Sequence, residues 1–197
     1  MLDNVNATDQ DECKLNAKSF AEFTKKKEGR YELIDGKAYL MSSPSVTHQR
    51  IAAHMYDELK ICFNNRKCEV FIPPLDVFLY DKNMGCSNVF QPDLLVVCDK
   101  KKIKEDGIHG APDIVVEVVS KSSRKNDYIR KLGSYMLKGV KEYWILDYEN
   151  EQAIVYSNIK NELSMVAYSL NGTAKSRVFD GLCVDFSMLF ANQDEIR

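Results

Sequence analysis

The sequence predicts an α/β domain in which a mixed β-sheet is flanked by helices and followed by a β-rich C-terminal extension. The chain has 197 residues, a length typical of one domain. Hydrophobic residues make up 45% of the chain, enough to form a full core. Short apolar runs of strand length are interspersed with segments of helical periodicity, a pattern typical of a sheet covered by helices. We expect a polar, flexible arm over residues 1–15 and a single domain over residues 16–197.

The N-terminal part of that domain is predicted to contain two helices separated by a hairpin. The first helix is expected over residues 16–28, ending at Gly29. In the following segment, YELIDGKAYLM, apolar residues alternate around a central Asp-Gly pair that favours a two-residue hairpin turn. Ser45 is a suitable N-cap for a longer helix over residues 46–63, where apolar residues recur at helical spacing.

The rest of the domain is predicted to consist mainly of strands. Five apolar segments have the length and composition of strands: CEVFI, LDVFLY, QPDLLVV, DIVVEVV and EYWILD. The segments DKNMGCSN and KKIKEDGIHGAP are expected to be connections, and a third helix is expected over residues 123–138, ending at Gly139. The C-terminal tail contains the candidate strands AIVYS and LSMVAYSL and a last apolar turn, FSMLF.

Composition and charge narrow the class of protein. The net charge of −2 does not by itself indicate a nucleic-acid-binding protein, although local patches matter more than the sum. No segment approaches the ~20 consecutive apolar residues that a membrane span requires. The start of the chain does not resemble a signal peptide, so we expect a cytoplasmic protein.

The six cysteines are expected to be reduced thiols in that compartment. No two of them form a C-x-x-C motif, and most lie in apolar segments, where a free cysteine behaves as a small hydrophobic residue. A zinc site is not expected either. His48 and His54 lie six residues apart, which directs them to different sides of a helix.

The strand segment DIVVEVVS contains two carboxylates, Asp113 and Glu117, although burying an unpaired carboxylate is costly. Alternate residues of a strand share a face, so Ile114, Val116 and Val118 form an apolar face and both carboxylates lie on the other. That second face is expected to meet a cavity, a cation or water. Asp113 follows a proline and fits a turn residue at the mouth of the strand. For Glu117 the alternatives are an exposed strand end, a lysine partner or a metal site.

A second acidic residue, Asp93, opens the apolar run that follows it. If the two strands pair, Asp93 and Glu117 converge from neighbouring backbones. Converging carboxylates repel each other unless a cation lies between them. Mg²⁺ fits, because it is held by one or two carboxylates together with waters and substrate phosphate. Such an ion can activate a water molecule and stabilise the charge that develops on a phosphodiester.

The third predicted helix could supply a cation to these carboxylates. Asp127, Lys131 and Tyr135 are spaced by four residues and share one helix face. For Asp127 we favour a surface ion pair. Lys131 can reach the carboxylates if the helix packs back over the sheet, where it would orient the attacking water or neutralise transition-state charge. His48 could face the same site, but a hydrogen-bonded helix histidine is the favoured interpretation.

Three basic segments, residues 25–27, 100–104 and 121–125, are candidates for contacts with phosphates. The alternative is that these lysines and arginines belong to a solvated surface.

Taken in order, the stretches YELIDGKAYLMSSPSVTHQRI, QPDLLVV and APDIVVEVVSKSSRKNDYIRKLGSYMLKGVKEYWILD resemble the Uma-two family of restriction-endonuclease-like proteins. This family is a branch of the PD-(D/E)xK nuclease superfamily. The resemblance covers about residues 20–190 and implies a restriction-endonuclease-like fold. It depends on the combination of PD, E-V-x-S, D-x-x-x-K-x-x-x-Y and G-V-x-E-Y-W.

The resemblance also implies roles for individual residues. Asp93 matches the metal-binding aspartate of the PD element, and Glu117 matches the acidic residue of the (D/E)xK element. Glu32 matches an additional acidic position that such folds can place near the metal, although it could equally be an exposed hairpin glutamate.

The sequence departs from the superfamily pattern at Val119, where a lysine is expected. The Uma-two family similarly lacks a lysine there. Lys131 is the natural replacement, reaching the site from another part of the backbone, and Lys121 is the second candidate.

The sequence thus predicts an endonuclease that hydrolyses DNA phosphodiester bonds with Mg²⁺ or Mn²⁺. Asp93 and Glu117 are the expected metal ligands, Lys131 the group that positions water, and Glu32 an auxiliary ligand. The alternative is a catalytically inactive nucleic-acid-binding or regulatory module that retains the nuclease fold. Cleavage of both strands of a duplex needs two sites, which favours a homodimer.

Overall fold

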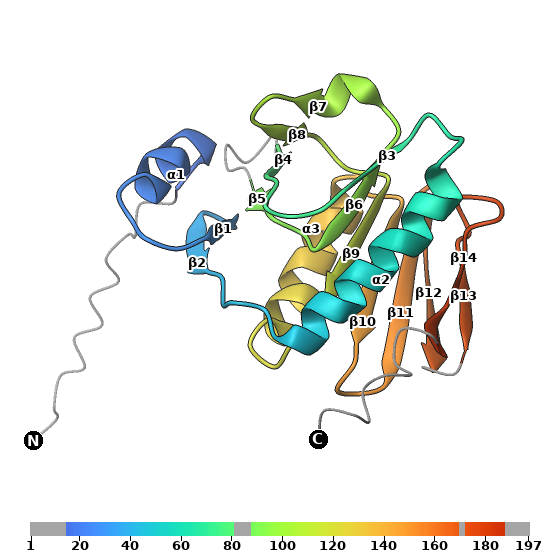
Figure 1. Cartoon of the computed structure of the whole chain (residues 1–197). Helices are drawn as coiled ribbons and strands as arrows, with labels where there is room; N and C mark the ends of the chain where they lie inside the picture. The colour runs from blue at the N-terminus through green and yellow to red at the C-terminus, as the bar shows by residue number, and fades with distance from the viewer. Residues whose placement is uncertain (1–14, 81–87, 170–171, 188–197) are drawn as a thin grey trace, which may run out of the picture.

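Two six-stranded mixed sheets contain most of the strands in the computed structural model, which describes residues 15–80, 88–169 and 172–187 (Figure 1). The hairpin sheet has the order β2 (Lys37–Leu40), β1 (Tyr31–Ile34), β5 (Asn88–Phe90), β4 (Val77–Leu79), β8 (Gly107–His109) and β7 (Ile103–Lys104). The central sheet has the order β12 (Glu162–Ser169), β11 (Gln152–Ile159), β10 (Glu142–Asp147), β9 (Ile114–Val118), β6 (Leu94–Val97) and β3 (Glu69–Phe71). A further pair joins β13 (Thr173–Lys175) to β14 (Cys183–Asp185).

Each sheet is mixed because it contains one parallel pair. In the central sheet β9 and β10 run parallel, and in the hairpin sheet β4 and β8 do. The predicted α/β class with a mixed sheet is confirmed, but the strands divide between two sheets. The β1–β2 hairpin is confirmed as well. Asp35 and Gly36 both have positive φ angles, 51° and 83°, as a two-residue turn of this kind requires.

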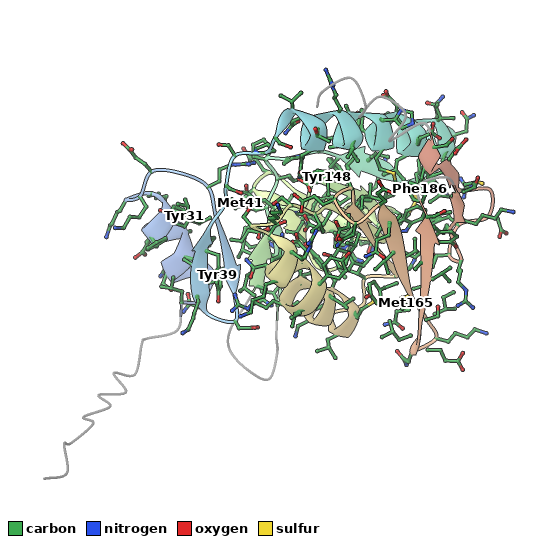
Figure 2. The ribbon with its side chains drawn as sticks, turned by 90° about the horizontal axis from the view of Figure 1, so that it is seen from below. Tyr31, Tyr39, Met41, Tyr148, Met165 and Phe186 are labelled. Carbon is green, nitrogen blue, oxygen red and sulfur yellow. A yellow bond between two sulfur atoms is a disulfide. The ribbon has the colours of Figure 1, made fainter. Side chains whose placement is uncertain are left out.

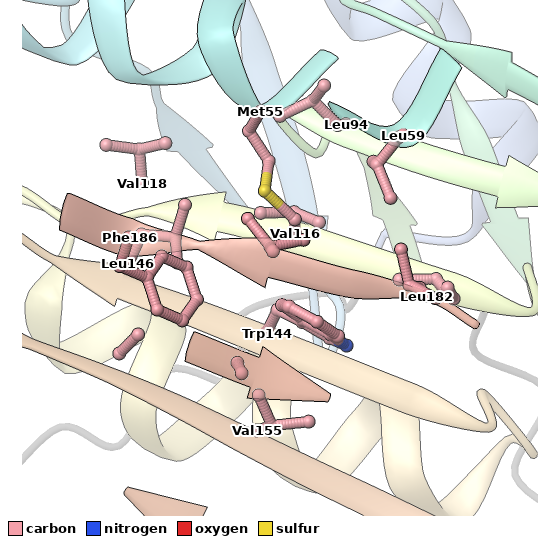
Figure 3. Close-up of a cluster of buried hydrophobic side chains, with 14 of the residues drawn as sticks. Met55, Leu59, Leu94, Val116, Val118, Trp144, Leu146, Val155, Leu182 and Phe186 are labelled. Carbon is pink, nitrogen blue, oxygen red and sulfur yellow. The ribbon is translucent and has the colours of Figure 1, made fainter. Parts of the chain in front are cut away.

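Helices cover both faces of the central sheet. Helix α2 (Val46–Phe63) has the predicted bounds and begins at Ser45, whose side chain accepts a hydrogen bond from the backbone N–H of His48. Figure 1 shows α2 lying across one face of the sheet. Figure 3 shows the apolar cluster beneath it, where Met55 reaches toward Val116.

The opposite face packs against the third helix. The sequence predicted one α-helix over residues 123–138, whereas the structure has a π-helical segment, η2 (Asn126–Lys131), followed by α3 (Leu132–Leu137). Val115 and Val119 of the Glu117-bearing face are buried with Tyr135 of α3. Both faces of β9 are therefore largely apolar, and Glu117 is an ionisable group set among buried apolar side chains.

The two predicted connections contain short elements that the sequence did not reveal. β5 begins at the last residue of the first, and the second begins within the 3₁₀ turn η1 (Lys100–Lys102) and contains β7 and β8. These strands have two or three residues each, too short for a clear apolar period. Helix α1 (Ala17–Thr24) is shorter than predicted.

The expectation that all cysteines are reduced is wrong for one pair. Cys68 and Cys98 form a disulfide, with their Cα atoms 3.9 Å apart. They adjoin the antiparallel β3–β6 pair, in which Glu69 lies opposite Val97, so the register brings the two cysteines face to face. Among the described cysteines, Cys62 and Cys183 are free.

Several predictions concern residues outside the described ranges. They include nearly all of the N-terminal arm, Cys13, Cys86 and the end of the FSMLF turn. Leu15, the last residue of the predicted arm, donates its backbone N–H to Gly36. In the part of the chain that the structure describes, no helix is both long enough and apolar enough to cross a membrane.

Candidate active site

The pairing of β6 with β9 brings Asp93 beside Glu117. The two strands are antiparallel, and Leu94 lies opposite Val116. One step further along this register, the residue before Leu94 faces the residue after Val116. Asp93 Oδ2 accepts a hydrogen bond of 2.8 Å from the backbone N–H of Val118. The carboxylates of the PD and EVV segments therefore come from adjacent strands.

Lys131 lies among three carboxylates beside this pair. Its Nζ is 2.9 Å from Glu32 Oε1, 3.0 Å from Glu117 Oε1 and 3.3 Å from Asp127 Oδ1. The Lys131 side chain is 4% exposed, so this ammonium faces the acidic group and not bulk solvent. Lys121, the second candidate for the missing lysine, is exposed and outside the cluster.

Glu32 is buried because β1 is an inner strand of the hairpin sheet, paired with both β2 and β5. Its Oε1 also accepts a hydrogen bond of 2.9 Å from the backbone N–H of Gln91. The alternative of an exposed hairpin glutamate is therefore wrong. On the other side, the Tyr135 hydroxyl donates a 3.2 Å hydrogen bond to Glu117 Oε1.

Asp127 also belongs to this cluster, which corrects the expectation of a surface ion pair. Its side chain is 2% exposed, and it lies four residues before Lys131 on the π-helical segment that packs against the sheet. Spacing by four was the correct signal for the Asp127–Lys131 contact. The shared face also carried the signal for the burial of Asp127, since Lys131 on that face was expected to reach the carboxylates.

Electrostatics follow from this burial. Burial raises the pKa of Glu117 well above its usual value; Asp127, Asp93 and Glu32 add to the increase and Lys131 opposes it. Burial likewise raises the pKa of Asp127. Burial alone would lower the pKa of Lys131, but the carboxylates of Glu117, Glu32 and Asp127 outweigh it and raise that pKa well above the lysine value. Lys131 is thus a permanent cation. Its single positive charge is shared among the three carboxyl groups of Glu32, Glu117 and Asp127, which is too little to balance all of them.

His48 completes the arrangement from the opposite face of the central sheet. Its Nε2 lies 3.1 Å from Asp93 Oδ2, and its side chain is 11% exposed. The favoured interpretation of His48 from sequence was a hydrogen-bonded helix histidine, with a position facing the site as the alternative, and the structure places it at the site. The missed signal is spacing: His48 lies three residues before Ile51 and seven before Met55, on the buried stripe of α2.

Asp113, the other carboxylate of the DIVVEVVS segment, is held away from the cluster. It accepts a 2.7 Å hydrogen bond from the backbone N–H of Cys98, and its other oxygen lies 2.7 Å from Lys141 Nζ. The side chain is nearly buried, so its role is to satisfy groups at the start of β9.

A cleft of about 330 Å³ opens over the acidic cluster. Glu32, Asp93, Glu117, Asp127 and Lys131 all line it. Its rim comes from the connection between β2 and α2 and from the serine-rich turn after β9. The rim and wall residues include Arg30, Tyr39, Met41, Ser42, Gln49, Ser122, Asn126 and Tyr148. In Figure 2, Met41 lies between the β1–β2 hairpin and Tyr148. The predicted basic segments at 25–27 and 100–104 do not line this cleft.

The donor set suits a hard divalent ion held partly by substrate. Asp93 and Glu117 offer carboxylate oxygens, and the hydrogen bonds described above engage Oδ2 of Asp93 and Oε1 of Glu117. Within the described ranges, no three His, Cys, Asp or Glu residues are arranged to hold a metal ion by themselves. A pair of carboxylates fits Mg²⁺, which keeps several waters and binds substrate phosphate, better than it fits a fully protein-bound metal.

Comparisons with known proteins agree with this architecture. The chain resembles a solved structure described as "a putative nuclease belonging to DUF820" from Anabaena variabilis ATCC 29413, with a TM-score of 0.69 and 18% identity. The similarity covers 84% of this chain and 92% of that one, which shows a shared nuclease-like fold. No curated protein matches the chain. The model of the Uma2 family, whose description is "Putative restriction endonuclease", matches residues 17–187, and the chain therefore belongs to that family.

Proposed function

We propose that this protein is a metal-dependent endonuclease that hydrolyses phosphodiester bonds of DNA. The observation that carries the proposal is the buried convergence of Asp93, Glu117 and Lys131 at the floor of a cleft. Family membership supports the choice of a nucleic acid as substrate. Asp93 and Glu117 would hold Mg²⁺ or Mn²⁺, which when bound supplies an activated water and stabilises negative charge on the phosphate.

The residues of the chain orient this chemistry. Lys131 donates a hydrogen bond to the attacking water or to a phosphate oxygen. Its contact with Asp127 is the longest of its three and is the one released. Glu32 keeps the ammonium aimed at Glu117, and Tyr135 fixes the Glu117 carboxylate by its hydrogen bond to Oε1. These supports place the water-positioning amine within reach of the metal ligands before substrate arrives.

The cleft is too acidic to receive a phosphate without added positive charge. Four carboxyl groups line it together with Arg30, His48 and Lys131, and carboxylates already engage His48 and Lys131. We therefore expect DNA affinity to increase when a divalent ion is present. Ca²⁺, which binds oxygen ligands, serves as the probe in a gel-shift assay.

The test of the proposal is cleavage of supercoiled plasmid with Mg²⁺, with Mn²⁺ and with EDTA. Wild type should cleave only with metal. Glu117→Gln and Asp93→Asn should lose more than the about 10–100-fold usual for a neighbour of a metal ligand, because they remove the ligand itself. The matched control is Asp113→Asn, a carboxylate of the same segment outside the cluster, which should cleave normally. Cleavage that survives Glu117→Gln would place the activity elsewhere or in a contaminant. A parallel assay with RNA determines the preferred nucleic acid.

The second candidate is a nucleic-acid-binding module without catalysis. It is favoured by Val119, which takes the place of the superfamily lysine and is fully buried in the apolar core. In that case the protein would shift DNA in gels, with a metal-dependent affinity, and leave it uncut under all conditions.

A further inference from the structure

The start of helix α2 reaches the acidic site from the face of the central sheet opposite Lys131. His48 is at the third position of the helix, and its backbone N–H is held by the N-cap side chain of Ser45 at 3.1 Å. Three and seven residues later, Ile51 and Met55 are buried in the core cluster below α2. Both the cap and this packing fix the height and rotation of the histidine ring.

Two nitrogen atoms lie close to one oxygen of Asp93, and one of them, the backbone N–H of Val118, donates a hydrogen bond to it. The backbone N–H of Val118 is 2.8 Å from Oδ2, and His48 Nε2 is 3.1 Å from the same atom. A carboxylate with one oxygen approached from two directions keeps its orientation at the wall of the cleft, which Asp93 lines. The other ring nitrogen of His48, Nδ1, is buried and has no hydrogen-bond partner within the described residues. Of the two ring nitrogens, Nε2 is therefore the one that makes a polar contact, and this contact is with Asp93.

We propose that His48 is a positioning residue that donates from Nε2 to Asp93 and thereby fixes this carboxylate for divalent-ion binding. The inference rests on the proposed function, since it assigns Asp93 to a metal. This role links the packing of α2 to the site. The helix packs on one face of the central sheet, and its histidine orients Asp93. From the opposite face, Lys131 and Tyr135 hold Glu117, the second proposed metal ligand. Hydrogen-bonded neighbours of metal-binding carboxylates commonly matter in this way.

The geometry identifies two substitutions that separate this role from simple packing. In His48→Gln the side-chain amide can reach the place of Nε2 and donate to Asp93. In His48→Asn the amide is shorter and matches the place of Nδ1, so it cannot. Both variants introduce a small polar side chain at the same helix position. His54→Asn is the matched control on the same helix, where the histidine lies 3.8 Å from Glu58 and is partly exposed.

The experiment measures Mn²⁺ binding by calorimetry, with and without uncleaved DNA, together with the cleavage rate as a function of Mn²⁺ concentration. We expect His48→Asn to weaken Mn²⁺ binding by about 10–100-fold and to regain cleavage at high Mn²⁺. His48→Gln should stay close to wild type, as should His54→Asn. Circular dichroism and thermal unfolding check that each variant is folded.

Wild-type affinity in His48→Asn would overturn the inference while leaving the proposed function intact. Equal losses in the Gln and Asn variants would also overturn it, because the ring would then act by its shape and not through Nε2. If wild type binds no Mn²⁺, alone or with DNA, the metal-dependent function itself fails and the inference fails with it.

Discussion

A single ammonium group, that of Lys131, offsets the charge of three buried carboxyl groups. Its contacts with Glu32, Glu117 and Asp127 span 2.9 to 3.3 Å, and each of these side chains is at most 5% exposed at the floor of the cleft. Removing water from ions costs several kcal/mol per charge, and one partner cannot compensate three. At the scale of single residues, Lys131 therefore stabilises the site, and the carboxyl groups that it cannot neutralise destabilise it.

Replacing Lys131 by methionine should destabilise the fold by about 3–5 kcal/mol, the usual effect of leaving buried charges without their partner. Urea unfolding in EDTA measures the change. Lys125→Met, an exposed lysine on the same helix, should change stability by less than about 0.5 kcal/mol. Adding Asp127→Asn to Lys131→Met should recover part of the loss, and no recovery would contradict the charge argument.

Glu117 should make the metal-free protein less stable as the pH rises. Its pKa is raised in the folded state, so the folded protein holds this proton at pH values where the unfolded chain has released it. Stability from Glu117 is full below its unfolded pKa, near 4.5, and is lost as the pH rises through the folded value. Urea unfolding of Glu117→Gln at pH 5 and pH 8 should show a relative gain for the variant at pH 8. The exposed Glu28→Gln is the control, and an equal difference at both pH values would contradict the prediction.

The third helix and its π-helical segment act at the scale of elements. π-helical turns are often found at functional sites, where the wider turn changes which side chains face inward. Here the segment Asn126–Lys131 buries Asp127 and Lys131 together. The helix then continues as α3, which packs Tyr135 against the sheet. Local backbone geometry and core packing therefore deliver the amine to the carboxylates.

Alanine substitutions at two glycines test how the local backbone conformation affects the stability of the β7–β8 turn and of α3. Gly107, at the β7–β8 turn, has φ +144°, and a Cβ there would lie 2.4 Å from the carbonyl oxygen of Asp76. Gly107→Ala should therefore destabilise the protein by more than about 2 kcal/mol. Gly133 is in α3 with nothing within 4 Å of an added Cβ, so Gly133→Ala should stabilise by about 0.5–1 kcal/mol. Thermal unfolding of both variants measures the contrast, and effects of the same sign would refute it.

At the scale of the whole molecule, the site lies where the two sheets and two helices meet. Glu32 comes from the hairpin sheet, Asp93 and Glu117 from the central sheet, His48 from α2 and Lys131 from the third helix. Close positioning of these groups therefore requires both sheets to be in place. The Cys68–Cys98 disulfide ties β3 to β6, the strand that leads out of the Asp93 turn.

Reduction of this disulfide should lower the stability of the folded protein by about 3–4 kcal/mol, the loop-entropy value for a closed loop of this length; the two cysteines are 30 residues apart. Urea unfolding with and without dithiothreitol measures the loss. Cys68→Ser should match the reduced wild type and be insensitive to dithiothreitol. Alkylation of Cys68 and Cys98 in unreduced protein, detected by mass spectrometry, would contradict the bond.

A long helix with a cap could be predicted from the sequence, whereas very short strands and the disulfide could not. Residues 46–63 combine a cap and a regular apolar period, and the helix has the predicted bounds. The strands β5, β7 and β8 have no such signal, because two or three residues cannot display a period. The disulfide was also unpredictable, since it depends on the register of β3 against β6 and not on the spacing of cysteines along the chain.

The sequence by itself determined the family, the α/β class and the acidic segments that contain Asp93 and Glu117, because these depend on local patterns and motif order. Only the tertiary structure decided that Glu32, Asp127 and His48 join them and that Asp113 does not. Burial is a property of contacts between segments far apart in the chain. Asp127 and Asp113 are both acidic residues beside apolar ones in sequence, yet one lies against Lys131 and the other against Lys141. Which partner each carboxylate meets is set by strand register and helix packing, and these are fixed only when the whole core forms.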